Sequence, residues 1–206
     1  MTFLSLCNGK DILNIEKAIP IPLEKLYDFP NHPFKVNDDK EMENMVETVK
    51  TGGIIMPLVV RQRDDGNYEI ISGHRRKMAS QKAGLKEVPC IIRDLSDDEA
   101  TIIMVDSNMQ RERILPSEKA FAYKMKLEAQ KHQGKRTDLT SCQVGTKLRA
   151  DEKIAENSED SARQIQRYIR LTELIPELLE LVDKEKDGMA FSPAVEISYL
   201  KEDEQY

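Results

Sequence analysis

The stretch Tyr68-Glu69-Ile70-Ile71-Ser72-Gly73-His74-Arg75-Arg76-Lys77-Met78-Ala79 predicts a strand that turns into the start of a helix. β-forming residues come first, Ser72-Gly73 breaks the strand, and helix-forming residues continue to Gly84, the expected helix end. The free N–H groups and the dipole of such a helix start favour an anion. Two arginines in the first turn are unfavourable for the helix itself, and a polyanion such as a nucleotide triphosphate would reverse that penalty. A surface helix whose arginines pair with local carboxylates is an equal alternative on this stretch alone.

The composition excludes several classes of protein. No apolar run approaches the roughly 18 residues of a membrane span, and the first ten residues lack the features of a signal peptide. Cys7, Cys90 and Cys142 are isolated, so we expect reduced thiols in the cytoplasm and no structural zinc site.

The net charge of −6 hides an uneven distribution. Residues 108–136 hold eight Lys or Arg against three Glu, whereas residues 171–206 hold three Lys against ten Asp or Glu. The basic middle is compatible with nucleic-acid binding, although a solvated charge run is the simpler explanation.

The residues around the opening stretch predict a compact α+β unit. Residues 19–21 read as an edge strand because Pro20 cannot donate to a ladder, and residues 38–50 read as an amphipathic helix capped by Asn37 or Asp38. Residues 58–63 form a hairpin with the opening stretch, and residues 88–93 form a third strand. Ser96 begins the next helix with a capping box.

A polar cluster follows that helix. Asp106 offers a carboxylate and Asn108 an amide oxygen to a magnesium ion, and Arg111 offers a second phosphate contact. A helix end whose arginines complement the dipole explains the same residues, and the cluster alone favours that explanation.

Residues 116–132 predict a helix with Ala120, Phe121, Met125 and Leu127 buried, followed by a polar loop over residues 133–147.

Residues 148–171 carry the pattern of a helix-turn-helix. A short helix over residues 151–157 is followed by a turn, and Asp160 or Ser161 caps a second helix that buries Ile165. The outward residues of that second helix are Arg163, Gln164, Gln166, Arg167 and Arg170. A face rich in Arg and Gln without an acidic residue suits the major groove, and the alternative is an ordinary helical hairpin.

Taken in order, these motifs resemble the ParB family of partition proteins, including its nucleoid-occlusion and conjugative-element relatives. The fragments that carry the resemblance are Asn31-His32-Pro33-Phe34, Pro57-Leu58-Val59-Val60, residues 72–79, Ser107-Asn108-Met109-Gln110-Arg111-Glu112 and Tyr168-Ile169-Arg170-Leu171.

The resemblance implies an α+β amino-terminal domain of the ParB and sulfiredoxin-like fold over residues 1–112, which binds the nucleotide. An all-α domain over residues 113–206 would follow, with its helix-turn-helix at about 150–171. The implied function is that of a CTP-gated DNA clamp that acts in chromosome, plasmid or mobile-element segregation, with CTP and Mg²⁺ as cofactors. The implied partners are a palindromic partition site on double-stranded DNA, a second copy of the chain and a ParA-type ATPase, and the implied location is the cytoplasm, on the nucleoid.

Site residues follow from the same resemblance. Those implied to bind the nucleotide are Ser72, Gly73, His74, Arg75, Arg76, Ser107, Asn108, Gln110 and Arg111. Those implied to approach the metal are Asp106 and Asn108. Those implied to bind DNA are Lys147, Arg149, Ser161, Arg163, Gln164, Arg167 and Arg170.

The chain departs from the family pattern at three points. His74 and Ser107 stand where the family has glutamates, so the resemblance implies nucleotide binding and leaves open whether this chain is a weak CTPase. We expect no carboxy-terminal dimerisation domain in the few residues after Leu200.

Two other functions compete with this interpretation. The amino-terminal fold is shared with ATP- or ADP-dependent serine kinases, and a DNA-binding adaptor with a decayed nucleotide pocket is also possible. Sulfiredoxin-like chemistry is disfavoured because it needs a cysteine where this chain has Ser72.

Overall fold

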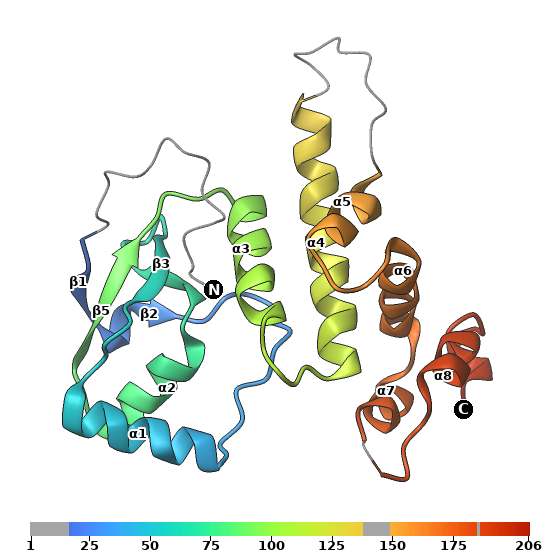
Figure 1. Ribbon diagram of the computed structural model, residues 1–206. Coiled ribbons are helices and arrows are strands. Elements are labelled where there is room, and N and C mark those ends of the chain that lie inside the picture. Colours follow the sequence, from blue (N-terminus) through green and yellow to red (C-terminus); the bar gives the residue numbers. More distant parts are fainter. Residues whose placement is uncertain (1–16, 138–148, 185) are drawn as a thin grey trace. The chain divides into compact units, whose positions relative to one another are not determined.

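The computed structural model describes residues 17–137, 149–184 and 186–206 (Figure 1). These residues form two compact units. The first joins the described residues up to Tyr27 with Asp38–Arg93, and the second joins Asp28–Asn37 with Asp94–Tyr206. An α+β unit followed by helices, as the sequence predicts, is confirmed.

The compact units divide at Arg93, whereas the predicted domain boundary lies at residue 112. The reason lies in the packing of the second unit, where helix α3 (Asp97–Met109) packs along α4 (Pro116–Thr137). The segment Asp28–Asn37 joins the same unit because the buried Glu118 carboxylate accepts hydrogen bonds from the backbone N–H of Lys35, at 2.7 Å, and of Leu115, at 3.1 Å.

The first unit contains a five-stranded sheet and two helices. The strands are β1 (Ile19–Pro22), β2 (Leu26–Tyr27), β3 (Leu58–Gln62), β4 (Tyr68–Ser72) and β5 (Glu87–Ile92), with a 3₁₀ turn at Leu23–Lys25. Their order in the sheet is β1-β5-β3-β4-β2, which confirms the predicted edge strand and the predicted hairpin of β3 with β4. An apolar cluster that includes Leu58, Val60 and Ile70 forms the core of this sheet.

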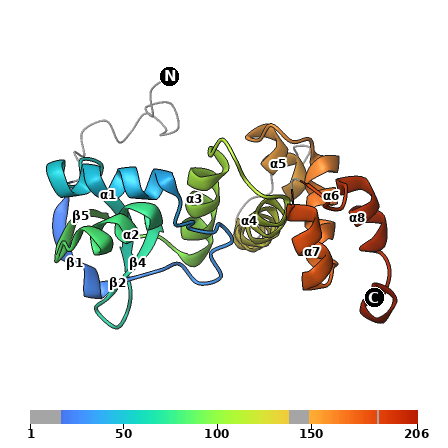
Figure 2. The same cartoon turned by 90° about the horizontal axis from the view of Figure 1, so that it is seen from below.

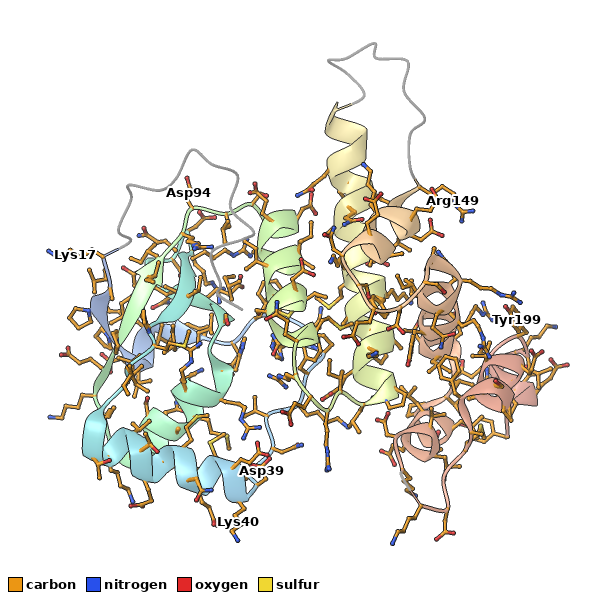
Figure 3. The ribbon with its side chains drawn as sticks, viewed as in Figure 1. Lys17, Asp39, Lys40, Asp94, Arg149 and Tyr199 are labelled. Atoms are coloured by element: carbon orange, nitrogen blue, oxygen red, sulfur yellow. The ribbon has the colours of Figure 1, made fainter. Side chains whose placement is uncertain are left out.

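Helices α1 (Lys40–Gly52) and α2 (His74–Ala83) pack against each other in the first unit. The predicted cap of α1 at Asn37 or Asp38 is wrong: the Asp39 side chain accepts from the N–H of Met42 at 2.9 Å (Figure 3 labels Asp39). Gly84 ends α2 in the left-handed conformation, as predicted.

The second unit is all-helical. Beside α3 and α4 it contains α5 (Ala150–Glu156), α6 (Ala162–Arg170), α7 (Pro176–Asp183) and α8 (Phe191–Ile197), with 3₁₀ turns at Leu171–Glu173 and Glu202–Glu204. Figure 2 shows α4 end-on, with α3 on one side and α5, α6 and α7 on the other. None of the described helices combines the length and apolar character that a bilayer crossing requires.

Helix α4 differs from its prediction in two ways. It continues to Thr137, into the stretch predicted as a loop, and the rest of that stretch lies outside the described residues. Phe121, predicted to be buried, is 40% exposed, whereas Tyr123 is 1% exposed. Helix α4 packs against α3 and also against α5, α6 and α7. Its buried positions are therefore spread around the helix, whereas the prediction assumed a single apolar stripe.

A hydrogen-bonded carboxylate connects α4 to the turn between α5 and α6. Asp160 accepts from the Tyr123 hydroxyl at 2.6 Å and from the Lys119 ammonium at 3.0 Å. Tyr123 also shares a hydrogen bond with the Ser158 hydroxyl at 2.8 Å. Burial, together with the bond to Asp160, raises the pKa of Tyr123, so the phenol remains a donor at neutral pH.

We predict that Tyr123→Phe lowers the free energy of unfolding by about 1–3 kcal/mol, because a buried bond to a charged acceptor is lost. Chemical denaturation followed by circular dichroism measures the change. Tyr206→Phe is the matched control, since Tyr206 is 86% exposed. Equal stability of Tyr123→Phe and wild type would show that the hydroxyl does not support the turn.

Candidate functional site

Strand β4 passes into α2 through Gly73, which has a φ of 116°. A side chain at this position would have its Cβ 2.8 Å from Cγ of Leu58, so both the backbone conformation and the close approach require glycine. The N-cap residue of α2 is Gly73, which has no side chain to cap the helix. The start of a helix favours an anion because its N–H groups and dipole point outward there. Ser72 is half-buried at the end of the strand, and His74 is buried as the first helical residue.

Arg75 pairs with two carboxylates in the same unit. Its Nη2 lies 3.2 Å from Oδ1 of Asp39 and 3.3 Å from Oε2 of Glu41, a side chain that is 81% exposed. This pairing is the alternative that the sequence allowed for the arginines. Ion pairs near the protein surface contribute only about 0–1 kcal/mol, so a phosphate can replace the carboxylates at small cost.

Arg76 has a different environment. Its Nη1 donates to the backbone carbonyls of Met56 and Pro57, each at 2.6 Å, and burial lowers the pKa of its guanidinium without neutralising it. These bonds hold the residues that lead into β3. The sequence assigns both arginines the same role, but their contacts differ. Arg75 forms ion pairs with side chains, whereas Arg76 donates hydrogen bonds to the backbone.

Of the three cysteines, Cys90 is the one that lies within the described residues, and it is buried in the sheet. Burial raises the pKa of its thiol to about 11, and its Sγ lies 3.5 Å from the carbonyl oxygen of Val88. A thiol of this kind is not a nucleophile at neutral pH, which counts against sulfiredoxin-like chemistry.

The second predicted cluster lies at the end of α3, in the second unit. Asn108 is buried, and its Nδ2 donates to the carbonyl of Met104 at 2.8 Å, which directs its amide oxygen away from that carbonyl. Ser107 donates to the same carbonyl at 3.0 Å. Gln110 is exposed at the helix end, and the Arg111 guanidinium lies 5.3 Å from the centre of the Phe34 ring.

Asp106, which is predicted to approach a metal ion, has a cationic partner in the structure. The Asp106 carboxylate forms a short ion pair with Lys126, whose side chain is 6% exposed. The Asp106 side chain is 49% exposed, so a metal ion that binds it would share the carboxylate with this buried ammonium. The described residues hold no group of three His, Cys, Asp or Glu side chains suited to a metal ion. The approach of Asp106 and Asn108 to a magnesium ion stays a prediction.

The two predicted nucleotide-binding sets belong to different units. Residues Ser72–Arg76 lie in the first unit, and Ser107, Asn108, Gln110 and Arg111 lie in the second. Each set has its own contacts, and each is tested separately.

The helix-turn-helix has the predicted form, with small shifts at its ends. Ser161 caps α6 by accepting from the N–H of Gln164, at 3.3 Å, and Ile165 is buried below it. Arg163, in the first turn, is exposed, and within the described residues it makes no hydrogen bond or ion pair. In the part of the chain that the structure describes, the Arg163 guanidinium at the start of α6 is therefore unpaired.

Arg149 and Gln166 both contact the carboxylate of Asp151. Arg149 is exposed at the start of α5 (Figure 3), with its Nη2 3.0 Å from Oδ2 of Asp151. Gln166, predicted to face outward, donates to the same carboxylate oxygen at 3.1 Å, which connects α6 to α5. Lys147, also predicted to bind DNA, lies outside the described residues.

Arg167 and Arg170 contact α8 and the residues after it, which the sequence did not indicate. The guanidinium of Arg167 lies over the Phe191 ring, and that of Arg170 lies over the Tyr199 ring. Helix α8 begins at Phe191, with Ala190 as its N-cap residue. The sequence signal that could have indicated the Arg167 contact is the aromatic residue Phe191, directly before Ser192-Pro193.

Comparison with known proteins gives a family match. Residues 10–109 match the model of the ParB N-terminal domain. A nucleoid occlusion protein of Geobacillus sp. (strain WCH70) is 41% identical over 113 residues, which are 55% of this chain and 40% of that protein. The chain thus matches two-fifths of the length of this relative.

Two solved structures share more of the chain. The C-terminally truncated chromosome-partitioning protein ParB from Caulobacter crescentus, complexed to the centromeric parS site, is 27% identical. The match has a TM-score of 0.54 and covers 87% of this chain and 84% of that one. The same truncated protein complexed with CTP-gamma-S is 26% identical, with a TM-score of 0.43 and coverage of 89% and 92%.

We predict that Gly73→Ala lowers the free energy of unfolding by about 1–3 kcal/mol, because it adds a clash with Leu58 to the strain of a positive φ. Gly66→Ala is the control, since Gly66 has a φ of 77° with open space around it, and we expect it to cost about 1 kcal/mol. Urea denaturation compares the two. Equal losses would mean that the approach of Gly73 to Leu58 is unimportant.

Proposed function

Because the chain carries a ParB N-terminal domain, as its motifs predicted, we propose that it is a sequence-specific DNA-binding partition protein whose DNA binding is gated by CTP. It binds a palindromic site as a homodimer and associates with the nucleoid. A ParA-type ATPase is the proposed partner.

The observation that carries the DNA part of the proposal is the start of α6. Recognition helices contact base edges mainly through residues of their first turns. Here that turn presents the exposed Arg163 guanidinium beside Gln164, on a helix that has no acidic residue in its first turn. The ParB structure at a TM-score of 0.54, which was solved on a parS site, supports the same conclusion.

The nucleotide part rests on the turn at Gly73. The start of α2 at Gly73 suits a phosphate, and Arg75 can exchange its carboxylate partners, Asp39 and Glu41, for one. Arg76 contributes by fixing the backbone of Met56 and Pro57. Hydrolysis is not part of the proposal, because His74 has replaced the family's glutamate, and no step runs through a metal.

We predict that Arg163→Ala removes about 1–3 kcal/mol of discrimination between a palindromic duplex selected by the chain from a randomised library and a scrambled duplex. Fluorescence anisotropy at fixed salt measures both affinities. Arg63→Ala, in the first unit, is the control for loss of one positive charge. Equal weakening on both duplexes would assign Arg163 to phosphate contact rather than base readout.

We predict that Arg75→Ala abolishes measurable CTP binding with little change in stability, because its partners are exposed. Arg76→Ala should weaken binding and also lower the melting temperature, because two carbonyls lose their donor. Isothermal titration with CTP, ATP and GTP measures the affinities, with Arg63→Ala as the control.

Unchanged CTP affinity in Arg75→Ala would refute the triphosphate assignment. A wild-type preference for ATP would favour the phosphotransferase alternative, and no binding of any nucleotide would favour the adaptor with a decayed pocket. Asn108→Ala tests the second set in the same titration.

A further inference from the structure

The three arginines of α6 have unequal surroundings. Arg163, Arg167 and Arg170 are spaced by four and three residues, so they follow one stripe of the helix. Like charges at this spacing repel one another. Arg163 is exposed without a partner among the described residues, whereas Arg167 and Arg170 are half-buried against α8 and the residues that follow it.

Arg167 is held on a platform formed by the first two residues of α8. Its guanidinium carbon lies 5.0 Å from the centre of the Phe191 ring, and its Nη2 donates to the Ser192 hydroxyl at 2.9 Å. Its Nη1 lies 3.4 Å from Oε1 of Gln164, one turn earlier on α6. The Phe191 ring is itself fixed, because it packs on Tyr168 with ring centres 4.8 Å apart.

Arg170 is bound more completely. Its Nη2 donates to the backbone carbonyl of Ser198, its Nε lies 3.4 Å from the Ser198 hydroxyl, and its guanidinium carbon lies 4.2 Å from the centre of the Tyr199 ring. Ser198 is 2% exposed and donates to the carbonyl of Val195 at 2.6 Å. The donors of Arg170 are thus directed at the end of α8.

We propose that α8 is a positioning platform for the recognition helix, and that Phe191 and Ser192 set Arg167 in its base-reading conformation. Arg170 is the anchor that fastens α8 to α6 and does not read bases. The proposal rests on the proposed function and deepens it, since it separates a positioned reader from an anchor among arginines that look alike in the sequence.

The physical basis is preorganisation. A free arginine loses much of its rotamer freedom when it binds a base edge, and this loss weakens binding. A guanidinium stacked on an aromatic ring and fixed by one hydroxyl has already lost that freedom, while its remaining N–H groups stay available. The platform also offsets repulsion between neighbouring arginines, because the ring face attracts the cation.

The test compares specific and non-specific DNA affinity in variants of the platform. Phe191→Leu keeps an apolar contact with Tyr168 and removes the ring, and Ser192→Ala removes only an exposed hydroxyl. We expect Phe191→Leu to raise the Kd for the library-selected duplex about 3- to 10-fold, with the Kd for the scrambled duplex unchanged within about 2-fold. Ser192→Ala should act in the same direction with a smaller effect, and it decides the question if Phe191→Leu does not fold.

Tyr199→Leu is the matched control, because it removes a ring from the anchor rather than from the reader. It should lower the melting temperature and leave the ratio of the two Kd values as in wild type. An unchanged ratio in both platform variants, or an equal change of the ratio in Tyr199→Leu, would overturn the proposal.

A measurement without DNA separates this proposal from the function on which it rests. A double-mutant cycle of Arg167→Lys and Phe191→Leu on thermal unfolding should show coupling between the two side chains. Absence of coupling would overturn the platform, whatever the chain does with DNA. Failure of the wild-type chain to prefer any duplex, with the coupling intact, would count against the proposed function instead.

Discussion

The amino-terminal unit depends on the contact between Gly73 and Leu58. With no side chain at Gly73, the turn from β4 into α2 lies directly against β3, where a Cβ would be 2.8 Å from Leu58. This approach places the Arg76 guanidinium at the carbonyls of Met56 and Pro57. The helix that follows has Gly73 as its N-cap residue and carries Arg75 in its first turn. One backbone constraint therefore produces both the packing of the sheet and an anion-binding turn.

In the helical unit, hydrogen-bonded carboxylates connect the elements. Asp160 connects the turn before α6 to Tyr123 and Lys119 of α4, and Glu118 connects α4 to the segment before α1. Glu118 is buried and Asp160 is partly buried. A carboxylate withdrawn from water is stable only when its hydrogen bonds are satisfied, so each of the two fixes the geometry around it. The orientation of α6 follows from these contacts rather than from its own short sequence.

Much of the fold could be predicted from local signals. Prolines placed β1 at the sheet edge, and the glycines at 73 and 84 marked both ends of α2. Roles set by distant partners could not be predicted. Arg75 and Arg76 are adjacent in sequence but point in different directions around the helix, and their partners lie at least 19 residues away. The platform for Arg167 lies 25 residues further along the chain, and the pairing of Asp106 with Lys126 spans 20.

The central claim is that one chain couples a nucleotide to DNA. The most direct test is the CTP affinity of the wild-type chain, measured with and without the library-selected duplex. If CTP changes the affinity for DNA by some factor, thermodynamic linkage requires that DNA change the affinity for CTP by the same factor. We predict tighter CTP binding in the presence of the selected duplex than with the scrambled one. Equal CTP affinity with both duplexes would contradict the account.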